Sequence, residues 1–351
     1  MTAQKPKTRF TTRLDIARGS VEMTHGGGGR AGAQLIDELF RRHFDSEGLR
    51  QDSDQAQLAR PSGRIAISTD SHVVSPLFFP GGDIGKLAVN GTVNDVAMAG
   101  AKPLYLSVGF ILEEGYPLAD LDRIAASMAA AAKEAGVAIV TGDTKVVERG
   151  KGDGVFISTT GVGVIPDGVE LLPRRIQAGD AILINGSIGD HGVAILSKRE
   201  NLEFDSEIVS DCAALNGLVA AMIAAVPDLH CLRDPTRGGL SAVLNELAVA
   251  SRTGMVVDER AIPVKAQVQA ACEFLGLDEL NIANEGKLVA FCPGDKAEEL
   301  LAVMRAHPLG AEAAIIGDVV EDSRALVRMK TQLGGERVID WLAGEQLPRI
   351  C

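Results

Sequence analysis

Apolar runs alternate with short polar and glycine-rich segments along most of the chain after residue 60. Short apolar runs predict strands at 64–70, 104–112, 137–141 and 155–165. Longer runs with helical spacing predict helices at 84–99 and 118–135, and a shorter one near 33–43. The first half of the chain therefore combines helices and strands in one α+β unit.

The second half shows the same mixture after a plausible linker at 166–178. The pattern predicts strands at 181–185, 287–291 and 315–320, and helices at 191–198, 208–225, 239–251, 266–274 and 296–307. We therefore expect an N-terminal extension over 1–24, one domain over 25–166 and a second over 179–341. Residues 342–351 contain Gly344 and Pro348 and are expected to form a flexible tail.

Composition narrows the class of protein. The 351 residues include 35 Lys and Arg against 47 Asp and Glu, a net charge of -12 without a basic run, so nucleic-acid binding is not expected. No apolar stretch approaches the roughly 20 residues that span a bilayer, and no signal-peptide pattern opens the chain. The five cysteines form no C-x-x-C pair, which argues against a zinc site or a disulfide framework. We expect a cytoplasmic protein without membrane contact.

A run of glycines, Gly26, Gly27, Gly28 and Gly29, follows His25. Consecutive glycines let backbone N–H groups converge on an anion, such as a phosphate. The spacing also satisfies G-x-G-x-x-G, but no strand precedes it, so a dinucleotide fingerprint is rejected. A flexible linker remains an equal alternative.

Acidic residues recur at the predicted ends of strands and along one helix. Asp70 closes an apolar strand among small hydroxyl residues, a setting that suits hydrated Mg²⁺ as well as a simple turn. In the helix that follows, Asp83 and Asn94 lie along one stripe and Asp95 lies one step around it. Lys86 follows a glycine as in a phosphate loop, although the Walker A pattern is incomplete. Their spacing among apolar residues favours a site over a solvated face.

Three further segments place polar groups at element ends. Asp143 and Lys145 are two residues apart, so in an extended strand both point to one side, as a metal-binding carboxylate and a phosphate-binding ammonium would. A surface ion pair is the alternative. Asp234 lies in Arg-Asp-Pro-Thr-Arg-Gly-Gly before an apolar helix, and Glu285 in Asn-Glu-Gly before a strand. The first segment would offer backbone N–H groups to an anion at a helix start, and the second places a carboxylate at a strand entrance. Ordinary capping and turn formation is the alternative for both.

Together these segments carry a resemblance. The ordered set H-G-G-G-G, S-T-D-S, G-G-D-I-G-K, N-D-V-A-M-A-G-A-K-P, T-G-D-T-K-V, R-D-P-T-R-G-G, N-E-G and a terminal P-R-I-C resembles the HypE family of hydrogenase maturation proteins, the carbamoyl dehydratases. That family belongs to the superfamily of aminoimidazole ribonucleotide synthetase and selenophosphate synthetase. The resemblance implies a two-domain PurM-like fold, an N-terminal domain whose strands build a dimer β-barrel, a C-terminal α/β domain, and a homodimer that binds ATP.

The resemblance also implies roles for individual residues. It implies Mg²⁺ ligands at Asp70, Asp95 and Asp234, and catalytic groups at Lys145, Glu285 and Cys351. It implies nucleotide contacts by Gly26, Gly27, Gly28, Gly29, Asp83, Lys86, Asn94 and Asp143.

The implied reaction dehydrates a carbamoyl group on Cys351 to a thiocyanate with ATP, and supplies cyanide for the iron centre of [NiFe]-hydrogenase. The family implies loading by the carbamoyltransferase HypF and delivery to a HypC–HypD complex. Two alternatives stay open: a relative that makes an activated small molecule, as selenophosphate synthetase does, and a non-catalytic carrier of a tail-bound group. The first usually has a reactive residue near its N-terminus, and here no cysteine precedes Cys212.

Overall fold

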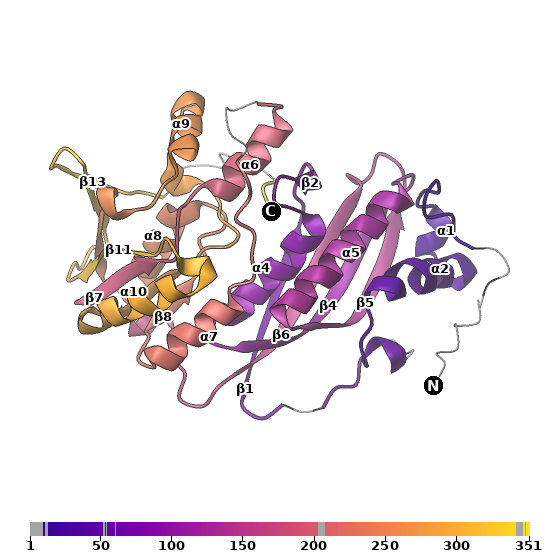
Figure 1. Cartoon of the computed structure of the whole chain (residues 1–351), viewed down its shortest axis with the longest axis horizontal. Helices are drawn as coiled ribbons and strands as arrows, with labels where there is room; N and C mark the ends of the chain where they lie inside the picture. The colour runs from indigo at the N-terminus through magenta and orange to yellow at the C-terminus, as the bar shows by residue number, and fades with distance from the viewer. Residues whose placement is uncertain are drawn as a thin grey trace.

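The computed structural model describes residues 10, 13–51, 53, 55–59, 61–202, 208–341, 347 and 349–351. Two lobes lie side by side, one built on a four-stranded sheet and the other on a seven-stranded sheet (Figure 1). Among the residues that the structure describes, no helix is long and apolar enough to cross a membrane.

The N-terminal sheet has the strand order β1-β6-β4-β5. These strands are β1 (Arg64–His72), β6 (Val155–Ile165), β4 (Lys102–Glu113) and β5 (Ala138–Val147). Strands β4 and β5 run parallel, and the other two pairs run antiparallel. A two-stranded hairpin, β2 (Phe78–Phe79) and β3 (Gly82–Asp83), precedes the first long helix.

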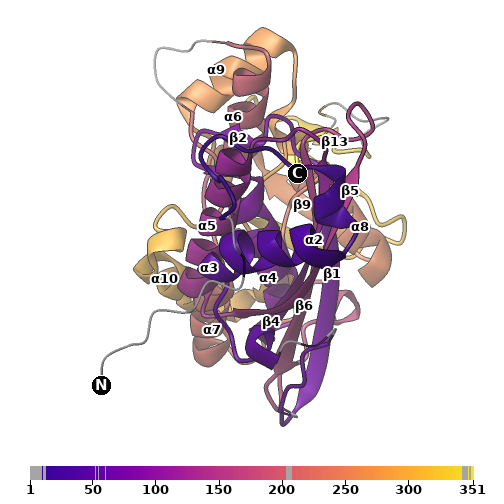
Figure 2. The same ribbon diagram turned by 90° about the vertical axis from the view of Figure 1, so that its right-hand side faces the viewer.

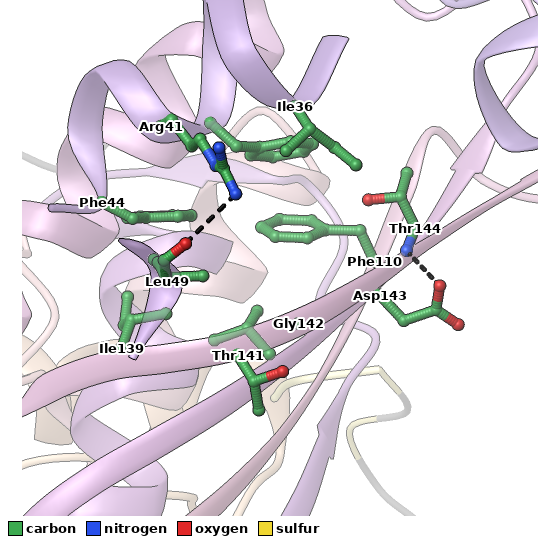
Figure 3. A pocket seen from close by; sticks show the side chains of 12 residues that line it. Ile36, Arg41, Phe44, Leu49, Phe110, Ile139, Thr141, Gly142, Asp143 and Thr144 are labelled. Carbon is green, nitrogen blue, oxygen red and sulfur yellow. Dashed lines mark hydrogen bonds between the residues drawn. The ribbon is translucent and has the colours of Figure 1, made fainter. Parts of the chain in front are cut away.

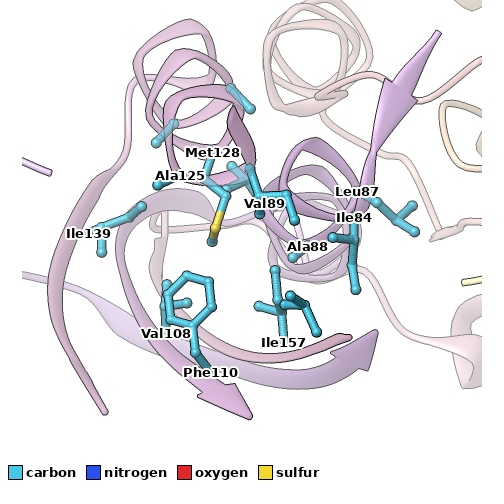
Figure 4. Close-up of a cluster of buried hydrophobic side chains, with 14 of the residues drawn as sticks. Ile84, Leu87, Ala88, Val89, Val108, Phe110, Ala125, Met128, Ile139 and Ile157 are labelled. Atoms are coloured by element: carbon cyan, nitrogen blue, oxygen red, sulfur yellow. The ribbon is translucent and has the colours of Figure 1, made fainter. Parts of the chain in front are cut away.

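Helices α4 (Ile84–Met98) and α5 (Leu118–Ala135) cover one face of this sheet (Figure 1). Side chains of both helices, such as Val89 and Met128, meet Phe110 and Ile157 from the strands in a fully buried cluster (Figure 4). Helix α4 is buried almost all round, because the sheet, α5 and the second lobe surround it. Its polar residues are therefore buried as well.

The opposite face of the N-terminal sheet is uncovered. Ile65 and Ile67 of β1 are 55% and 69% exposed, and Ile111 of β4 is 44% exposed. Successive side chains of a strand point to opposite faces, so these residues share the face turned away from α4 and α5. An apolar sheet face left open to water is the kind of surface that a second subunit covers.

The segment before residue 60 packs against the same domain. It forms α1 (Met23–Gly26), α2 (Gly29–Leu35), a π-helical turn (Ile36–Phe40) and α3 (Arg41–His43), seen against the N-terminal lobe in Figure 2. Val21 is buried and donates its N–H to the Tyr116 carbonyl at 2.8 Å. The predicted boundary at residue 24 thus does not separate an extension from the domain, while residues 1–9 and 11–12 lie outside the described residues.

The C-terminal sheet has the order β13-β12-β9-β11-β7-β10-β8. Its strands are β7 (Asp180–Ile184), β8 (Cys231–Arg233), β9 (Gly254–Asp258), β10 (Val289–Pro293), β11 (Ala314–Val320), β12 (Val327–Lys330) and β13 (Glu336–Val338). Its helices are α6 (Asp190–Arg199), α7 (Asn216–Ala225), α8 (Gly239–Ser251), α9 (Ala266–Leu275) and α10 (Ala297–Ala306). Short 3-10 turns occur at Leu49–Gln51, Pro173–Arg175, Glu259–Ala261, Glu279–Asn281, Gly294–Lys296 and Pro308–Gly310.

Most predicted elements are present with shifted ends. Strand β5 runs on to Val147, beyond the predicted end at residue 141, because its Thr-Gly-Asp-Thr-Lys segment continues the pairing with β4. The predicted helix over 208–225 is wrong in its first half, since α7 begins only at Asn216. Residues 208–215 instead cross between the lobes, where the Ser210 N–H donates to the Pro80 carbonyl at 2.9 Å. Strands β8, β9, β12 and β13 were not predicted.

Close packing of α4 on β6 depends on a glycine that a larger residue cannot replace. A Cβ atom at Gly163 would overlap Val96 and lie 2.8 Å from the Lys102 carbonyl oxygen. We expect Gly163→Ala to lower the free energy of unfolding by about 1–3 kcal/mol, measured by chemical denaturation. Gly217→Ala is the matched control. Gly217 lies in helix α7, and a Cβ atom there would have the His307 ring as its nearest neighbour, at 3.5 Å. That substitution should be neutral or stabilising by up to about 1 kcal/mol; equal losses in both variants would contradict the packing argument.

Candidate active site

A cleft of about 500 Å³ lies between the two lobes. Its charged lining consists of carboxylates and guanidinium groups, and the thiol-bearing C-terminal residue also faces it: Asp70, Asp95, Asp234, Glu285, Arg233, Arg237, Glu246 and Cys351. The cleft thus brings together all three predicted metal ligands and two of the three predicted catalytic residues. Across the described residues, no three side chains of the metal-binding types already stand close enough to enclose an ion.

The N-terminal lobe contributes Asp70 from β1 and Asp95 from α4. Ser68 lies on the same side of β1 as Asp70, and its hydroxyl donates to the Asp95 carboxylate at 2.7 Å. Helix α4 can approach β1 because Gly91 has no side chain; a Cβ there would lie 3.4 Å from Asp70 Oδ2 and 3.1 Å from the His72 ring. Strand and helix therefore present their carboxylates to one space.

The C-terminal lobe contributes Asp234 and Glu285 from two neighbouring loops. Asn284 ties these loops together, because its Nδ2 donates to the Pro235 carbonyl at 2.8 Å and its Oδ1 accepts from the Gly189 N–H at 2.8 Å. The Glu285 N–H donates to Asp211 Oδ1 at 3.1 Å. These bonds hold the Glu285 backbone in place from both sides.

Asn94 of α4 joins the lobes at this point. Its Nδ2 donates to the Glu285 carbonyl at 3.2 Å and to the Ala213 carbonyl at 3.0 Å, and its Oδ1 accepts from the Leu215 N–H at 2.8 Å. Both amide hydrogens are used within the protein. These bonds hold the Glu285 backbone against α4, and the nucleotide contact that the sequence resemblance implies for Asn94 stays a prediction.

Burial and mutual repulsion raise the pKa values of three cleft carboxylates, Asp95, Asp234 and Glu285. Burial is the main cause for Asp234, whose pKa rises to about 7, and the charge of Asp95 adds to it. The pKa of Glu285 is raised well above its ordinary range by burial and then by the nearby carboxylates. Burial also raises the pKa of Asp95. This cleft is a concentration of negative charge that a bound cation would relieve.

Asp211 contacts the Glu285 backbone from outside the cleft lining, and its pKa shifts the other way. Burial alone would raise its pKa, but Lys287 at 3.0 Å and the Glu285 N–H outweigh burial and lower it. Asp211 is thus a fixed negative charge beside Glu285. Neither Asp211 nor Lys287 stands out in the sequence, because the pair forms only when the two loops meet.

The end of the chain lies in this cleft, beside β2 and α6 (Figure 1). Ile350 is buried, and an α-carboxylate oxygen of Cys351 accepts from the Val73 N–H at 3.0 Å. The sequence predicts a flexible tail over 342–351, but its last three residues are docked. Residues 342–346 and 348, including Gly344 and Pro348, lie outside the described residues.

Other predicted site residues lie elsewhere. Asp143 and Lys145 do share one side of β5, with Lys145 Nζ 2.7 Å from Asp143 Oδ1, but both are exposed. Asp143 pairs with Gly109 and Lys145 with Ile111, which places them on the uncovered face of the sheet. Neither of them lines the interdomain cleft. Gly26 packs against Val146, the residue after Lys145, so the start of the glycine run lies against β5.

Asp83 and Lys86 form a third group at the start of α4. Asp83 accepts from the N–H groups of Gly85 at 2.7 Å and Lys86 at 3.1 Å, which makes it the N-cap of the helix. The Lys86 ammonium donates to the Gly81 carbonyl at 3.0 Å. Neither residue lines the interdomain cleft.

A smaller, mainly apolar pocket of about 80 Å³ lies beside Asp143 (Figure 3). Phe44 and Phe110 form its aromatic walls, Ile139 lies below them, and the Arg41 guanidinium lies above, donating to the Leu49 carbonyl at 3.1 Å. The sequence pattern does not predict this pocket, because its walls come from the segment 36–49 and from strands β4 and β5, which meet only in the folded chain.

Comparison with known proteins follows the same division into two domains. Residues 52–165 match the N-terminal domain, and residues 177–330 the C-terminal domain, of AIR synthase related proteins. The chain is 67% identical to carbamoyl dehydratase HypE of Azotobacter vinelandii over 97% of this chain and 100% of that protein.

Two solved structures are also similar. A crystal structure of the hydrogenase maturation protein HypE in complex with ATP matches with a TM-score of 0.91 and 52% identity, over 94% of this chain and 99% of that one. A crystal structure of a HypE–HypF complex matches with a TM-score of 0.78 and 50% identity, over 88% of this chain and 99% of that one.

Because the pKa of Asp234 is raised, ionisation of this carboxyl should lower the free energy of unfolding of the metal-free protein in a pH-dependent way. Its pKa is about 7 in the folded state against an ordinary 3.8, so the stability associated with its proton is lost as pH rises through that interval. Asp234→Asn should therefore raise the melting temperature in EDTA by roughly 3 °C or more at pH 8, and by less at pH 4.5. Asp211→Asn is the opposite control, since the folded state lowers that pKa, and it should destabilise the protein at pH 8. A pH-independent effect of Asp234→Asn would contradict the burial argument.

Proposed function

The chain belongs to the HypE family of carbamoyl dehydratases, within the AIR synthase related proteins, and on this premise we propose how its own residues carry out the reaction. The substrate is a carbamoyl group on the chain's own Cys351, which is converted to a thiocyanate with consumption of ATP. One observation carries the proposal: the terminal Cys351 lines the same interdomain cleft as Glu285 and three aspartates.

The reaction needs a carbamoyl oxygen that has been converted to a good leaving group, and a base that removes both protons from the carbamoyl nitrogen. In Cys351–S–C(=O)NH₂ the oxygen leaves poorly, so the γ-phosphoryl group of ATP is transferred to it. The nitrogen then loses its protons, the C–O bond breaks, and Cys351–S–C≡N forms with ADP and phosphate. Every step requires that the thiol end of the tail, the phosphoryl group and a base meet in one place.

The carboxylates of Asp70, Asp95 and Asp234 are proposed to hold Mg²⁺. All three line the same cleft, and the carboxylate oxygens that they present are the hard ligands that Mg²⁺ prefers. Mg²⁺ usually completes its shell with water and with phosphate oxygens of the substrate. Bound Mg²⁺ would neutralise charge on the transferring phosphoryl group.

Glu285 is proposed as the base. Its backbone is fixed by Asn94 and Asp211, so its side chain enters the cleft from a rigid loop. Burial raises the pKa of Glu285, and a carboxylate with a raised pKa accepts a proton more readily than an ordinary one. Arg233 and Arg237 line the same cleft and would face the departing phosphate.

The second group of residues is proposed to bind the nucleotide. A HypE relative of similar structure is known in complex with ATP. Here the glycine run, Asp143 and Lys145 lie together at the end of β5, next to the aromatic pocket. Apolar walls suit an adenine ring, while Lys145 and the backbone N–H groups of Gly26–Gly29 suit phosphates. Asp83 and Lys86 are proposed to line the nucleotide site from the start of α4.

We also propose a homodimer joined through the uncovered sheet face. Ile65, Ile67 and Ile111 would be buried there, and Asp143 and Lys145 lie on the same face. Two such sheets facing each other would form the dimer β-barrel that the sequence resemblance implies. The nucleotide group would then lie at the interface.

The partners follow from the chemistry of loading and delivery. A HypE–HypF complex is known for a relative, so we propose HypF as the carbamoyltransferase that loads Cys351. The HypC–HypD complex is proposed as the acceptor of the cyanide.

Dehydration should depend on Glu285 and Lys145 after loading has occurred. Glu285→Gln and Lys145→Ala proteins, carbamoylated by HypF and then supplied with Mg-ATP, should keep the carbamoyl adduct on the C-terminal peptide. In the parent protein that peptide should lose the mass of one water. We expect dehydration to slow by roughly 100-fold or more in both variants, as followed by mass spectrometry.

Lys133→Ala is the matched control for Lys145→Ala, because Lys133 is also exposed but lies on α5, outside both nucleotide and carboxylate groups. Chelation of the loaded parent protein with EDTA should stop dehydration. A normal yield of thiocyanate from Glu285→Gln or Lys145→Ala would exclude the role given to that residue.

The dimer proposal makes a separate prediction. Ile67→Glu places a charge on the open sheet face and should convert the protein to a monomer in sedimentation or light-scattering measurements, because a buried unpaired charge is costly. Val249→Glu is the control, since Val249 is 57% exposed on α8 of the other lobe. Unchanged association in Ile67→Glu would place the interface elsewhere.

A further inference from the structure

The last three residues are bound by polar groups from three separate parts of the chain. Cys351 and Arg349 pair with residues 73 and 75. The Val73 N–H donates to an α-carboxylate oxygen of Cys351 at 3.0 Å, and the Ser75 N–H donates to the Arg349 carbonyl at 3.2 Å. The Arg349 side chain donates back to the Val73 carbonyl at 3.1 Å and pairs with Asp153. The tail end is therefore bound by specific contacts as well as apolar packing.

His191 supplies the deepest of these contacts. It is fully buried at the start of α6, and its Nε2 lies 2.8 Å from the Ile350 carbonyl oxygen. A carbonyl oxygen only accepts, so Nε2 must carry the proton. The neutral ring that burial favours then has a bare Nδ1, which accepts from the Ser210 hydroxyl at 2.8 Å.

This imidazole is itself held in a fixed orientation. The Cys212 N–H donates to the Ser210 hydroxyl oxygen at 3.2 Å, so the hydroxyl proton is directed toward His191. The edge of the His191 ring meets Phe79 at a centroid distance of 5.6 Å and an angle of 89°. A buried donor with its tautomer and orientation fixed in advance resembles a binding site more than a filler of the core.

Arg199, at the other end of the same helix, holds the next carbonyl. Its Nη2 donates to the Arg349 carbonyl at 2.7 Å, and its Nε donates to the Ser75 carbonyl at 2.8 Å. Helix α6 therefore grips two consecutive carbonyls of the tail from its two ends. Between them, the Ile350 side chain is buried in the apolar cluster that also contains Phe79 and Ile195.

The tail adopts a demanding backbone shape in this site. Arg349 has φ of 56°, in the left-handed region that non-glycine residues rarely adopt. Such a conformation persists where surrounding contacts over-determine it. Here the contacts to both Arg349 and Ile350 carbonyls do so, and they set the register that brings the Cys351 thiol into the cleft.

We propose that α6, through His191 and Arg199, is a receptor for the C-terminal Arg-Ile-Cys segment and sets the fraction of molecules whose thiol lies in the cleft. His191 and Arg199 are positioning residues: they touch the tail backbone and not the reacting atoms. The proposal rests on the proposed function only in taking Cys351 as the carrier of the substrate.

The test measures docking without ATP, a carbamoyl group or a partner. The full-length protein is treated with N-ethylmaleimide under native conditions, and labelling of the C-terminal peptide is followed by mass spectrometry. The other four cysteines are buried and report on general loosening of the fold. Loss of one hydrogen bond to the tail should increase the labelling rate of Cys351 by about two- to tenfold in His191→Ala and in Arg199→Ala.

Two variants separate tail recognition from general destabilisation. His191→Gln keeps a donor near the Ile350 carbonyl and an acceptor near Ser210, so it should restore slow labelling at least in part. His230→Gln is the matched control: His230 is also buried in the C-terminal lobe, but it pairs with Asp180 at 2.8 Å and not with the tail. It should leave Cys351 labelling unchanged.

Ile350→Ala covers the case in which His191→Ala fails to fold, because this change lies at the chain end. It should increase labelling by roughly tenfold, since a buried side chain is lost. Parent-like labelling in both His191→Ala and Ile350→Ala would overturn the receptor, as would an equal increase in His230→Gln. If the proposed dehydration fails in every protein, including the parent, the labelling differences still decide the receptor separately.

Discussion

Four carboxylates can stay together in a half-closed cleft only because hydrogen bonds hold their backbones there. Asn94 and Asn284 are the two side chains on which this depends, the first joining α4 to the Glu285 carbonyl and the second joining the loops of Asp234 and Glu285. Neither amide carries charge, so each can be buried at the cost of its hydrogen bonds alone. The loops therefore do not move apart. Burial and the neighbouring carboxylates instead raise the pKa values of Asp234 and Glu285.

Helix α4 links this arrangement to the rest of the fold. One side of it packs with α5 on the sheet, and another carries Asn94 and Asp95 toward the second lobe. A helix with water on one face would orient by its apolar stripe, but α4 is enclosed on nearly every side, so its rotation is fixed by polar contacts also. Any displacement of α4 would move Asp95 and the Glu285 loop together.

The sequence predicts the fold class and the main elements well because their apolar runs are long and regular, as in α5 and β6, whose ends match the prediction. It also predicts that Asp143 and Lys145 share one side of β5, which the hydrogen bonds confirm. It could not say which face of the sheet that side is, because the answer depends on the register with β4.

Other features escaped sequence analysis for related reasons. The receptor for the tail involves Val73, His191 and Arg199, which are far apart in the sequence and form no motif. The end of the chain looks unstructured by composition, since its contacts are made by backbone carbonyls that every sequence has. The short strands β12 and β13 lack the length on which a periodic signal depends.

Docking of the chain's own terminus has a kinetic consequence. A substrate that is covalently part of its catalyst has no bulk concentration, and its effective concentration is set by the tether, in the millimolar range for short flexible connections. The rate of conversion should then be first order in loaded protein and insensitive to dilution, and each molecule must be reloaded before it can act again. The overall turnover rate then depends on how fast the terminus moves between loading, conversion and discharge. The affinity of His191 and Arg199 for the Ile350 and Arg349 carbonyls must therefore be high enough to hold the thiol for the reaction and low enough to release it to the next partner.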